Sequence, residues 1–134
     1  MTNDVFFDTN VLVYVLTADA LKADRSEALI RDGGIVSVQV LNECAHVLRR
    51  KFAANWDQIN LASRSMREAC GVVGVSEDVH ERGLAYAQRY KLQIYDAMIV
   101  AAAVLAGCTT LYSEDMYDGL VIDGLTIKNP FAVA

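Results

Sequence analysis

Val5-Phe6-Phe7-Asp8-Thr9-Asn10-Val11-Leu12-Val13 lies near the start of this chain and indicates its architecture. The first three residues form a short apolar run of strand-forming side chains, which is typical of a buried strand. Asp8-Thr9-Asn10 follows at once and can cap a helix, which we expect from about Val11 through Thr17. A buried strand that leads through a polar cap into a helix predicts an α/β fold.

The rest of the chain alternates between the same two kinds of segment. Short β-rich runs predict strands at 35–38, 72–75 and 109–112, and a fifth strand at 125–127 on an edge of the sheet. Apolar spacing and helix-end residues predict helices at 22–31, 39–52, 55–69, from 77 onward, and 95–106. This alternation predicts a mainly parallel sheet with helices on both faces. We expect one domain over residues 1–134.

Composition is typical of a folded protein. Apolar residues make up 54% of the chain, the mean hydropathy is +0.24, and there is one proline, so disorder is not expected. The uncharged stretch 97–113 approaches the length of a membrane span, but Gly107 interrupts it. We therefore expect a buried helix and then a buried strand there. Lys and Arg are absent before Asp8, which argues against a secretory signal and for a cytoplasmic protein without a membrane span.

The cysteines and histidines do not suggest a zinc site or a disulfide. Cys44, Cys70 and Cys108 are odd in number and far apart, so we expect buried, reduced thiols. His46 and His80 lack the spacing of zinc ligands.

Four acids occur in unusually apolar or well-placed settings: Asp8, Glu43, Asp96 and Asp115. A carboxylate driven toward a core must be protonated, paired or bound to a metal, because burying it bare is costly. Too few Lys or Arg residues stand beside these acids to pair them all. A shared site for a divalent cation is the simplest interpretation.

The expected topology brings these four acids to one edge of the sheet. Asp8 ends the first strand, Asp115 lies just past the fourth, and Glu43 and Asp96 lie in the first turns of two helices. Ligands of open α/β sheets bind at the carboxyl ends of the strands. Each acid alone has a simpler explanation, as a helix cap for Asp8 and Asp96 and as a solvated charge for the others. Four such coincidences at one edge favour a common site.

Four segments in this order resemble PIN-domain ribonucleases, in particular the VapC-type toxins of prokaryotic toxin–antitoxin pairs. The resemblance extends over essentially the whole chain, to the closing stretch at 121–131. Its segments are Phe-Phe-Asp-Thr-Asn-Val-Leu-Val-Tyr (6–14), Val-Gln-Val-Leu-Asn-Glu (38–43), Tyr-Asp-Ala-Met-Ile-Val-Ala-Ala-Ala (95–103) and Leu-Tyr-Ser-Glu-Asp-Met (111–116).

The resemblance implies a three-layer α/β/α fold and a Mg²⁺- or Mn²⁺-dependent endoribonuclease. Its catalytic acids fall on Asp8, Glu43, Asp96 and Asp115. It also implies a homodimer that is held inactive by a cognate antitoxin protein.

Residue roles follow from the resemblance and from carboxylate chemistry. Asp8, Asp96 and Asp115 would bind the metal, because hard cations prefer carboxylate oxygens. Glu43 would bind it directly or orient the attacking water. The small polar position that the family pairs with the last acid falls on Ser113. Ser113 and Asn10 would position the carboxylates. Either Asp115 or Asp118 completes the acidic set.

The formal net charge of −5 and the pI of about 4.9 argue at first sight against an RNA partner. If four acids hold metal, however, the rest of the chain is nearly neutral. Local basic groups then become candidates for RNA binding, although short basic runs are also typical of solvated helix ends. The candidates are Arg49, Arg50, Lys51 and Arg64.

Two alternatives stay open at this stage. One is a catalytically degenerate PIN-like module that only binds a partner, and the apolar helix pair 40–52 and 55–69 is a candidate antitoxin or dimer surface. The other is a metal-dependent phosphatase that begins with an Asp after an apolar strand. That chemistry uses a second acid two residues later, where this chain has Asn10.

Overall fold

The computed structural model describes residues 4–132, and its strands form one six-stranded sheet. The strand order is β3-β2-β1-β4-β6-β5, and neighbouring strands are parallel except for the antiparallel pair β5–β6. The mainly parallel sheet expected from the sequence is therefore confirmed. The strands are β1 (Val5–Phe7), β2 (Ile35–Ser37), β3 (Gly71–Val73), β4 (Thr110–Tyr112), β5 (Val121–Ile122) and β6 (Leu125–Lys128).

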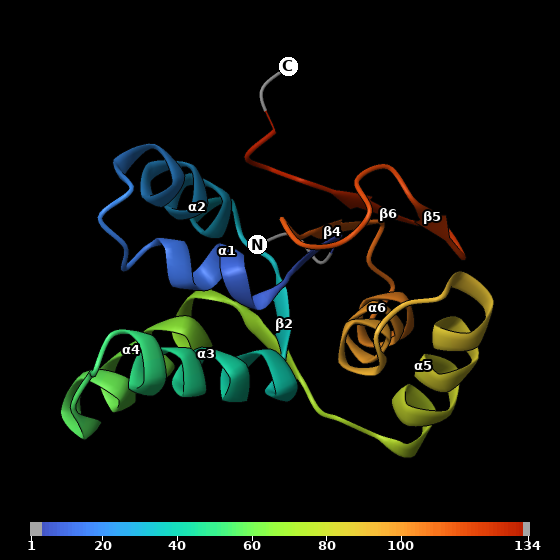
Figure 1. Cartoon of the computed structure of the whole chain (residues 1–134), viewed down its shortest axis with the longest axis horizontal. Coiled ribbons are helices and arrows are strands. Elements are labelled where there is room, and N and C mark those ends of the chain that lie inside the picture. The colour runs from blue at the N-terminus through green and yellow to red at the C-terminus, as the bar shows by residue number, and fades with distance from the viewer. Residues whose placement is uncertain (1–3, 133–134) are drawn as a thin grey trace.

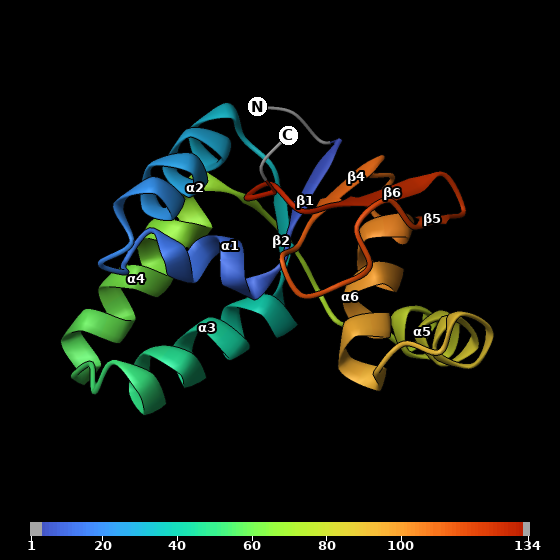
Figure 2. The same ribbon diagram turned by 45° about the horizontal axis from the view of Figure 1, so that its top comes forward.

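Helices cover both faces of this sheet and complete a three-layer α/β/α fold. Figures 1 and 2 show α1 to α4 gathered on one side of the sheet and the pair α5 and α6 on the other. This confirms the predicted fold class. The helices are α1 (Thr9–Tyr14), α2 (Ala20–Asp32), α3 (Val38–Lys51), α4 (Trp56–Ala69), α5 (Glu77–Tyr90) and α6 (Ile94–Leu105).

The core lies between the central strands and α6. Phe6 and Phe7 of β1 and Leu111 of β4 are completely buried, and every residue from 97 to 103 on α6 is buried as well. The uncharged stretch at 97–113 is therefore a buried helix followed by a strand, as expected. Among residues 4–132, no helix is both long and apolar enough to cross a membrane. All three cysteines are buried, also as expected.

Helix caps explain two differences between the structure and the predicted boundaries. Asp8 caps α1 and places Thr9 and Asn10 inside the helix, so the predicted helix 11–17 starts too late. It also extends too far, since α1 ends at Tyr14. The predicted strand 35–38 loses Val38 to α3, because the Ser37 hydroxyl accepts a hydrogen bond from the backbone N–H of Val40 and caps that helix. The capping box of Asn55 and Gln58 is confirmed.

The predicted edge strand at 125–127 is not on the edge. β6 is covered by β5, a short strand that the apolar pattern did not predict. Asp123 and Gly124 form the two-residue turn between them, with φ of 47° and 86°. Both residues have positive φ, as in the tight turns that join hairpin strands.

Candidate functional site

The four predicted acids line one cavity of about 920 Å³. Asp8 follows β1 and Asp115 lies beyond β4, while Glu43 and Asp96 lie near the first turns of α3 and α6. The cavity thus lies where the strands of the parallel sheet end, which is the edge at which open α/β sheets bind ligands.

Asp8 is the most buried of these acids, with 5% of its surface exposed. One carboxylate oxygen accepts a hydrogen bond from the backbone N–H of Thr9, and the other accepts one from the Ser113 hydroxyl, both at 2.7 Å. The pKa of Asp8 is raised to about 6, chiefly by burial. The hydrogen bonds from Ser113 and Thr9 lower the pKa, and the nearby Asp96 and Glu43 carboxylates raise it. Asp8 is therefore both a helix cap and a carboxylate held in an unfavourable setting.

Glu43 is held from two directions. One oxygen accepts a hydrogen bond from the Thr9 hydroxyl at 2.8 Å, and the other accepts one from the Gln39 amide at 3.4 Å. Gln39 also donates to the backbone carbonyl of Tyr95 at 3.0 Å, and so ties α3 to the first turn of α6. Glu43 is thus positioned within the cavity and is not a freely solvated charge.

Asp96 lies inside the first turn of α6, whose N-cap is Gln93. The cap explanation for Asp96 is therefore excluded. Burial raises the pKa of Asp96, and the carboxylates of Glu43 and Asp115 raise it further. Nearby carboxylates thus make both Asp8 and Asp96 harder to ionise, as expected for acids gathered in one site.

Asp115, and not Asp118, lines the cavity with the other acids. The Asn10 amide donates to Asp115 at 3.1 Å, and its oxygen accepts from the backbone N–H of Glu114 at 3.3 Å. Asp118 instead accepts a hydrogen bond from the backbone N–H of Asn129 at 2.9 Å. The resemblance paired Ser113 with the last acid, but the Ser113 hydroxyl donates to Asp8. The residue after β4 thus holds the first acid, and Asn10 near β1 holds the last one.

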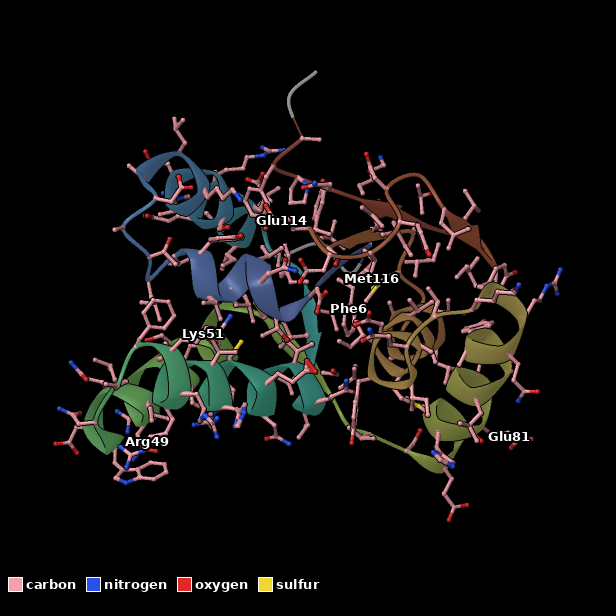
Figure 3. All side chains as sticks on the ribbon, in the orientation of Figure 1. Phe6, Arg49, Lys51, Glu81, Glu114 and Met116 are labelled. Atoms are coloured by element: carbon pink, nitrogen blue, oxygen red, sulfur yellow. The ribbon has the colours of Figure 1, made fainter. Side chains whose placement is uncertain are left out.

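Glu114 is a fifth acid that lines the cavity, and its ion pair was not predicted from the sequence. Its carboxylate accepts hydrogen bonds from the Lys22 ammonium at 2.6 Å and from the Tyr14 hydroxyl. Burial alone would raise the pKa of Glu114, but these two hydrogen bonds outweigh it and lower the pKa. Lys22 is 92 residues away, so no local sequence signal could have revealed the pair. Figure 3 shows Glu114 beside α1 and α2.

The side chains around the four acids suit a hard divalent cation, because such cations prefer carboxylate oxygens as ligands. The nearby Cys44 does not line the cavity, and its thiol donates to the backbone carbonyl of Thr9 at 3.9 Å. Burial raises the pKa of this thiol to about 12. Within residues 4–132, no three His, Cys, Asp or Glu side chains are already arranged as a metal-binding group. The acids share a cavity but do not converge on one point.

The four basic residues predicted to bind RNA lie in different surroundings. Lys51 lines the cavity with the acids. Arg49 packs over the Trp56 ring at 4.8 Å and donates to the backbone carbonyl of Ala54 at 3.2 Å. Arg50 and Arg64 are exposed and lie outside the cavity lining.

The PIN domain family model matches residues 5–117. Solved structures share the fold as well. A toxin–antitoxin complex from Klebsiella pneumoniae has 23% identity, covers 96% of this chain and 99% of its own, and has a TM-score of 0.74. VapC20 of Mycobacterium tuberculosis is a toxin that cleaves the sarcin–ricin loop. It has 19% identity, covers 83% of this chain and 89% of its own, and has a TM-score of 0.68.

The third structure is VapBC2 from Rickettsia felis bound to a DNA fragment from its promoter. It has 17% identity, covers 93% of this chain and 97% of its own, and has a TM-score of 0.67. No curated protein sequence matches this chain significantly.

Proposed function

This chain belongs to the PIN domain family, and on that premise we propose that it is a VapC-type toxin that hydrolyses RNA as a divalent-metal-dependent endoribonuclease. The observation that carries the proposal is the meeting of Asp8, Glu43, Asp96 and Asp115 in one cavity. The fold alone has no need for this arrangement, since clustered carboxylates destabilise one another. The toxin that cleaves the sarcin–ricin loop and shares this fold supports the choice of RNA as the substrate.

In the proposed site, Asp8, Asp96 and Asp115 would hold the cation, and Glu43 would either join them or orient the attacking water. When bound, Mg²⁺ or Mn²⁺ would supply a nucleophilic water near neutral pH and would offset charge on the scissile phosphate. Ser113 fixes one oxygen of Asp8 and Asn10 fixes one of Asp115, which leaves the remaining lone pairs for the ligand. Thr9 and Gln39 orient Glu43 in the same way.

The proposal includes a cognate antitoxin and a homodimer in the cytoplasm. An apolar cavity of about 600 Å³ lies between α1, α2, α3 and α4, and it is lined in part by the exposed side chains of Leu16, Phe52 and Leu61. This surface includes the helix pair predicted from the sequence, and its chemistry suits an apolar segment of a partner. Toxin–antitoxin complexes among the structures that share the fold support an antitoxin as that partner.

The test is cleavage of total cellular RNA by antitoxin-free protein, with Mg²⁺ or Mn²⁺ against EDTA. We expect discrete fragments that require the metal and that disappear with Asp96→Asn, because Asp96 lies in the cavity and is not a helix cap. Cleavage that survives in Asp96→Asn would contradict the proposed site. A folded protein that binds metal but cleaves no RNA would favour the partner-binding module.

Two adjacent acids provide a matched comparison in the same assay. Asp115→Asn should reduce cleavage by at least about 100-fold, since loss of a group that merely orients a metal ligand already costs roughly 10- to 100-fold. Glu114→Gln should change cleavage much less, because Lys22 and Tyr14 already occupy that carboxylate. Equal losses in the two variants would refute the assignment of Asp115.

A further inference from the structure

The acid-lined cavity continues past the acids along α3. His46, Val47, Lys51 and Phe52 line it together with Glu43. Lys51 lies eight residues beyond Glu43, which corresponds to about 12 Å along a helix axis. The cavity therefore has an acidic end and a second end, about two helical turns away, that carries a cationic and an aromatic side chain.

Lys51 is the basic residue of the Arg49-Arg50-Lys51 run that faces this cavity. Arg49 is engaged elsewhere, stacked on Trp56 and bonded to the carbonyl of Ala54. Figure 3 shows Lys51 directed into the space between α1 and α3, while Arg49 lies on the outer side of α3. Two side chains of equal charge, two residues apart, thus face different surroundings.

Phe52 stands next to Lys51 at the C-cap of α3, and 44% of its surface is exposed. It borders both this cavity and the apolar cavity between α1, α2, α3 and α4. Tyr95, 72% exposed, lines the same cavity and immediately precedes Asp96. Exposed aromatic rings beside a cationic group are the elements with which proteins bind single-stranded RNA, since bases stack on the rings and phosphates pair with the cation.

We propose that Lys51 and Phe52 form a subsite for a nucleotide that flanks the scissile phosphate in single-stranded RNA. Lys51 binds the phosphate of that nucleotide and the Phe52 ring stacks on its base. This assignment rests on the proposed ribonuclease function and adds to it the path of the RNA strand along α3, away from the acids. It also separates Lys51 from Arg49, Arg50 and Arg64 as the basic residue that contacts the substrate.

The test measures binding of a fluorescent single-stranded RNA of about 12 nucleotides, a length within the range bound by one single-strand-binding fold. Every variant is made in the Asp96→Asn background so that the RNA stays intact. Lys51→Gln should weaken binding about fivefold at 0.1 M salt and lower the slope of log K against log salt by about 0.7, as expected for one lost phosphate contact to a single strand. Arg49→Gln is the control of equal charge change, and it should leave both quantities nearly unchanged.

The stacking role is tested with Phe52→Leu, which should weaken binding by about fivefold or more, and with Phe52→Tyr, which keeps the ring and should restore it. Melting temperatures identify any variant that has lost its fold. If Phe52→Leu binds as well as the parent, or if Phe52→Tyr binds as poorly as Phe52→Leu, the stacking role is refuted.

The outcomes for Lys51 are separable from those for the ribonuclease. If Lys51→Gln has no effect, or if Lys51→Gln and Arg49→Gln weaken binding equally, the subsite is refuted even when the parent protein cleaves RNA. If the parent protein binds but does not cleave, and Lys51→Gln still weakens binding selectively, the subsite stands and the ribonuclease proposal fails.

Discussion

Asp8 shows how a single residue serves two requirements that conflict. Its carboxylate caps α1 through the backbone N–H of Thr9, which an asparagine side chain would do as well. Its burial and its acidic neighbours, however, make the ionised form costly, and burial is the largest of these effects. Without a bound cation, the ionised Asp8 carboxylate therefore lowers the stability of the fold. Its negative charge is useful only for the proposed metal-dependent chemistry.

This conflict predicts an unusual effect of Asp8→Asn in EDTA. Because the pKa of Asp8 is raised from 3.8 to about 6, the unfolded state loses this proton first as the pH rises, and stability falls between those two values. The cost above pH 6 is about 3 kcal/mol at most. Asp8→Asn removes that cost, so the variant should be more stable than the parent at pH 7.5 and close to it at pH 4. Urea unfolding at both pH values measures the difference.

The control for this comparison is Asp118→Asn, which changes an acid outside the cavity. It removes one negative charge, as Asp8→Asn does, but leaves the buried Asp8 carboxylate in place. A parent protein that is more stable than Asp8→Asn at pH 7.5 in EDTA would contradict the raised pKa of Asp8.

At the scale of elements, the position of β1 determines where Asp8 points. The Phe7 ring is completely buried and packs beside Gly34, in the link between α2 and β2. A Cβ atom at position 34 would lie 2.5 Å from Cε2 of Phe7 and 3.1 Å from the backbone carbonyl oxygen of Val5. The glycine is thus required for the close approach of this link to the strand that carries the first acid.

Gly34→Ala should therefore destabilise the protein by about 1–3 kcal/mol, since overpacking a tight core shifts side chains and backbone. Gly74→Ala is the control, because no atom lies within 4 Å of the added Cβ there. Its effect should stay within about 0.5 kcal/mol. Denaturant unfolding compares both variants with the parent, and equal stabilities for the two variants would contradict the close packing at Gly34.

At the scale of the whole molecule, the acidic cavity joins segments from both ends of the chain. Asp8 and Asn10 come from the first elements, and Ser113 and Asp115 from the loop after β4, with hydrogen bonds across more than 100 residues of sequence. A ligand that binds this cavity therefore acts on the stability of the complete fold and not on one loop.

We accordingly expect Mg²⁺ to raise the melting temperature of the parent protein by several degrees. A cation present at 100 times its Kd adds about 2.7 kcal/mol of stability when it binds only the folded state. In Asp8→Asn the rise should be much smaller, because a proposed ligand is lost. Thermal unfolding in Mg²⁺ and in EDTA measures both effects. An unchanged melting temperature of the parent would count against a cation site in this cavity.

Local sequence patterns were sufficient for the fold class and for the four cavity acids. Strand and helix periodicity, the capping box at Asn55 and the polar turn after Phe7 act over a few residues, so they can be recognised without the fold. The parallel topology then brings the carboxyl ends of β1, β2 and β4 together, which explains why Asp8, Glu43, Asp96 and Asp115 were predicted to meet. The single-domain extent and the catalytic roles of these acids stay predictions.

Packing between distant segments determined the remaining features. Whether Asp115 or Asp118 lines the cavity, which acid Ser113 contacts, and how Lys22 neutralises Glu114 depend on where side chains meet after folding. The same holds for the division between Lys51, which faces the cavity, and Arg49, which faces Trp56. A sequence records the kind of each side chain and its local repeat, whereas contacts across 90 or more residues arise only when the elements pack against one another.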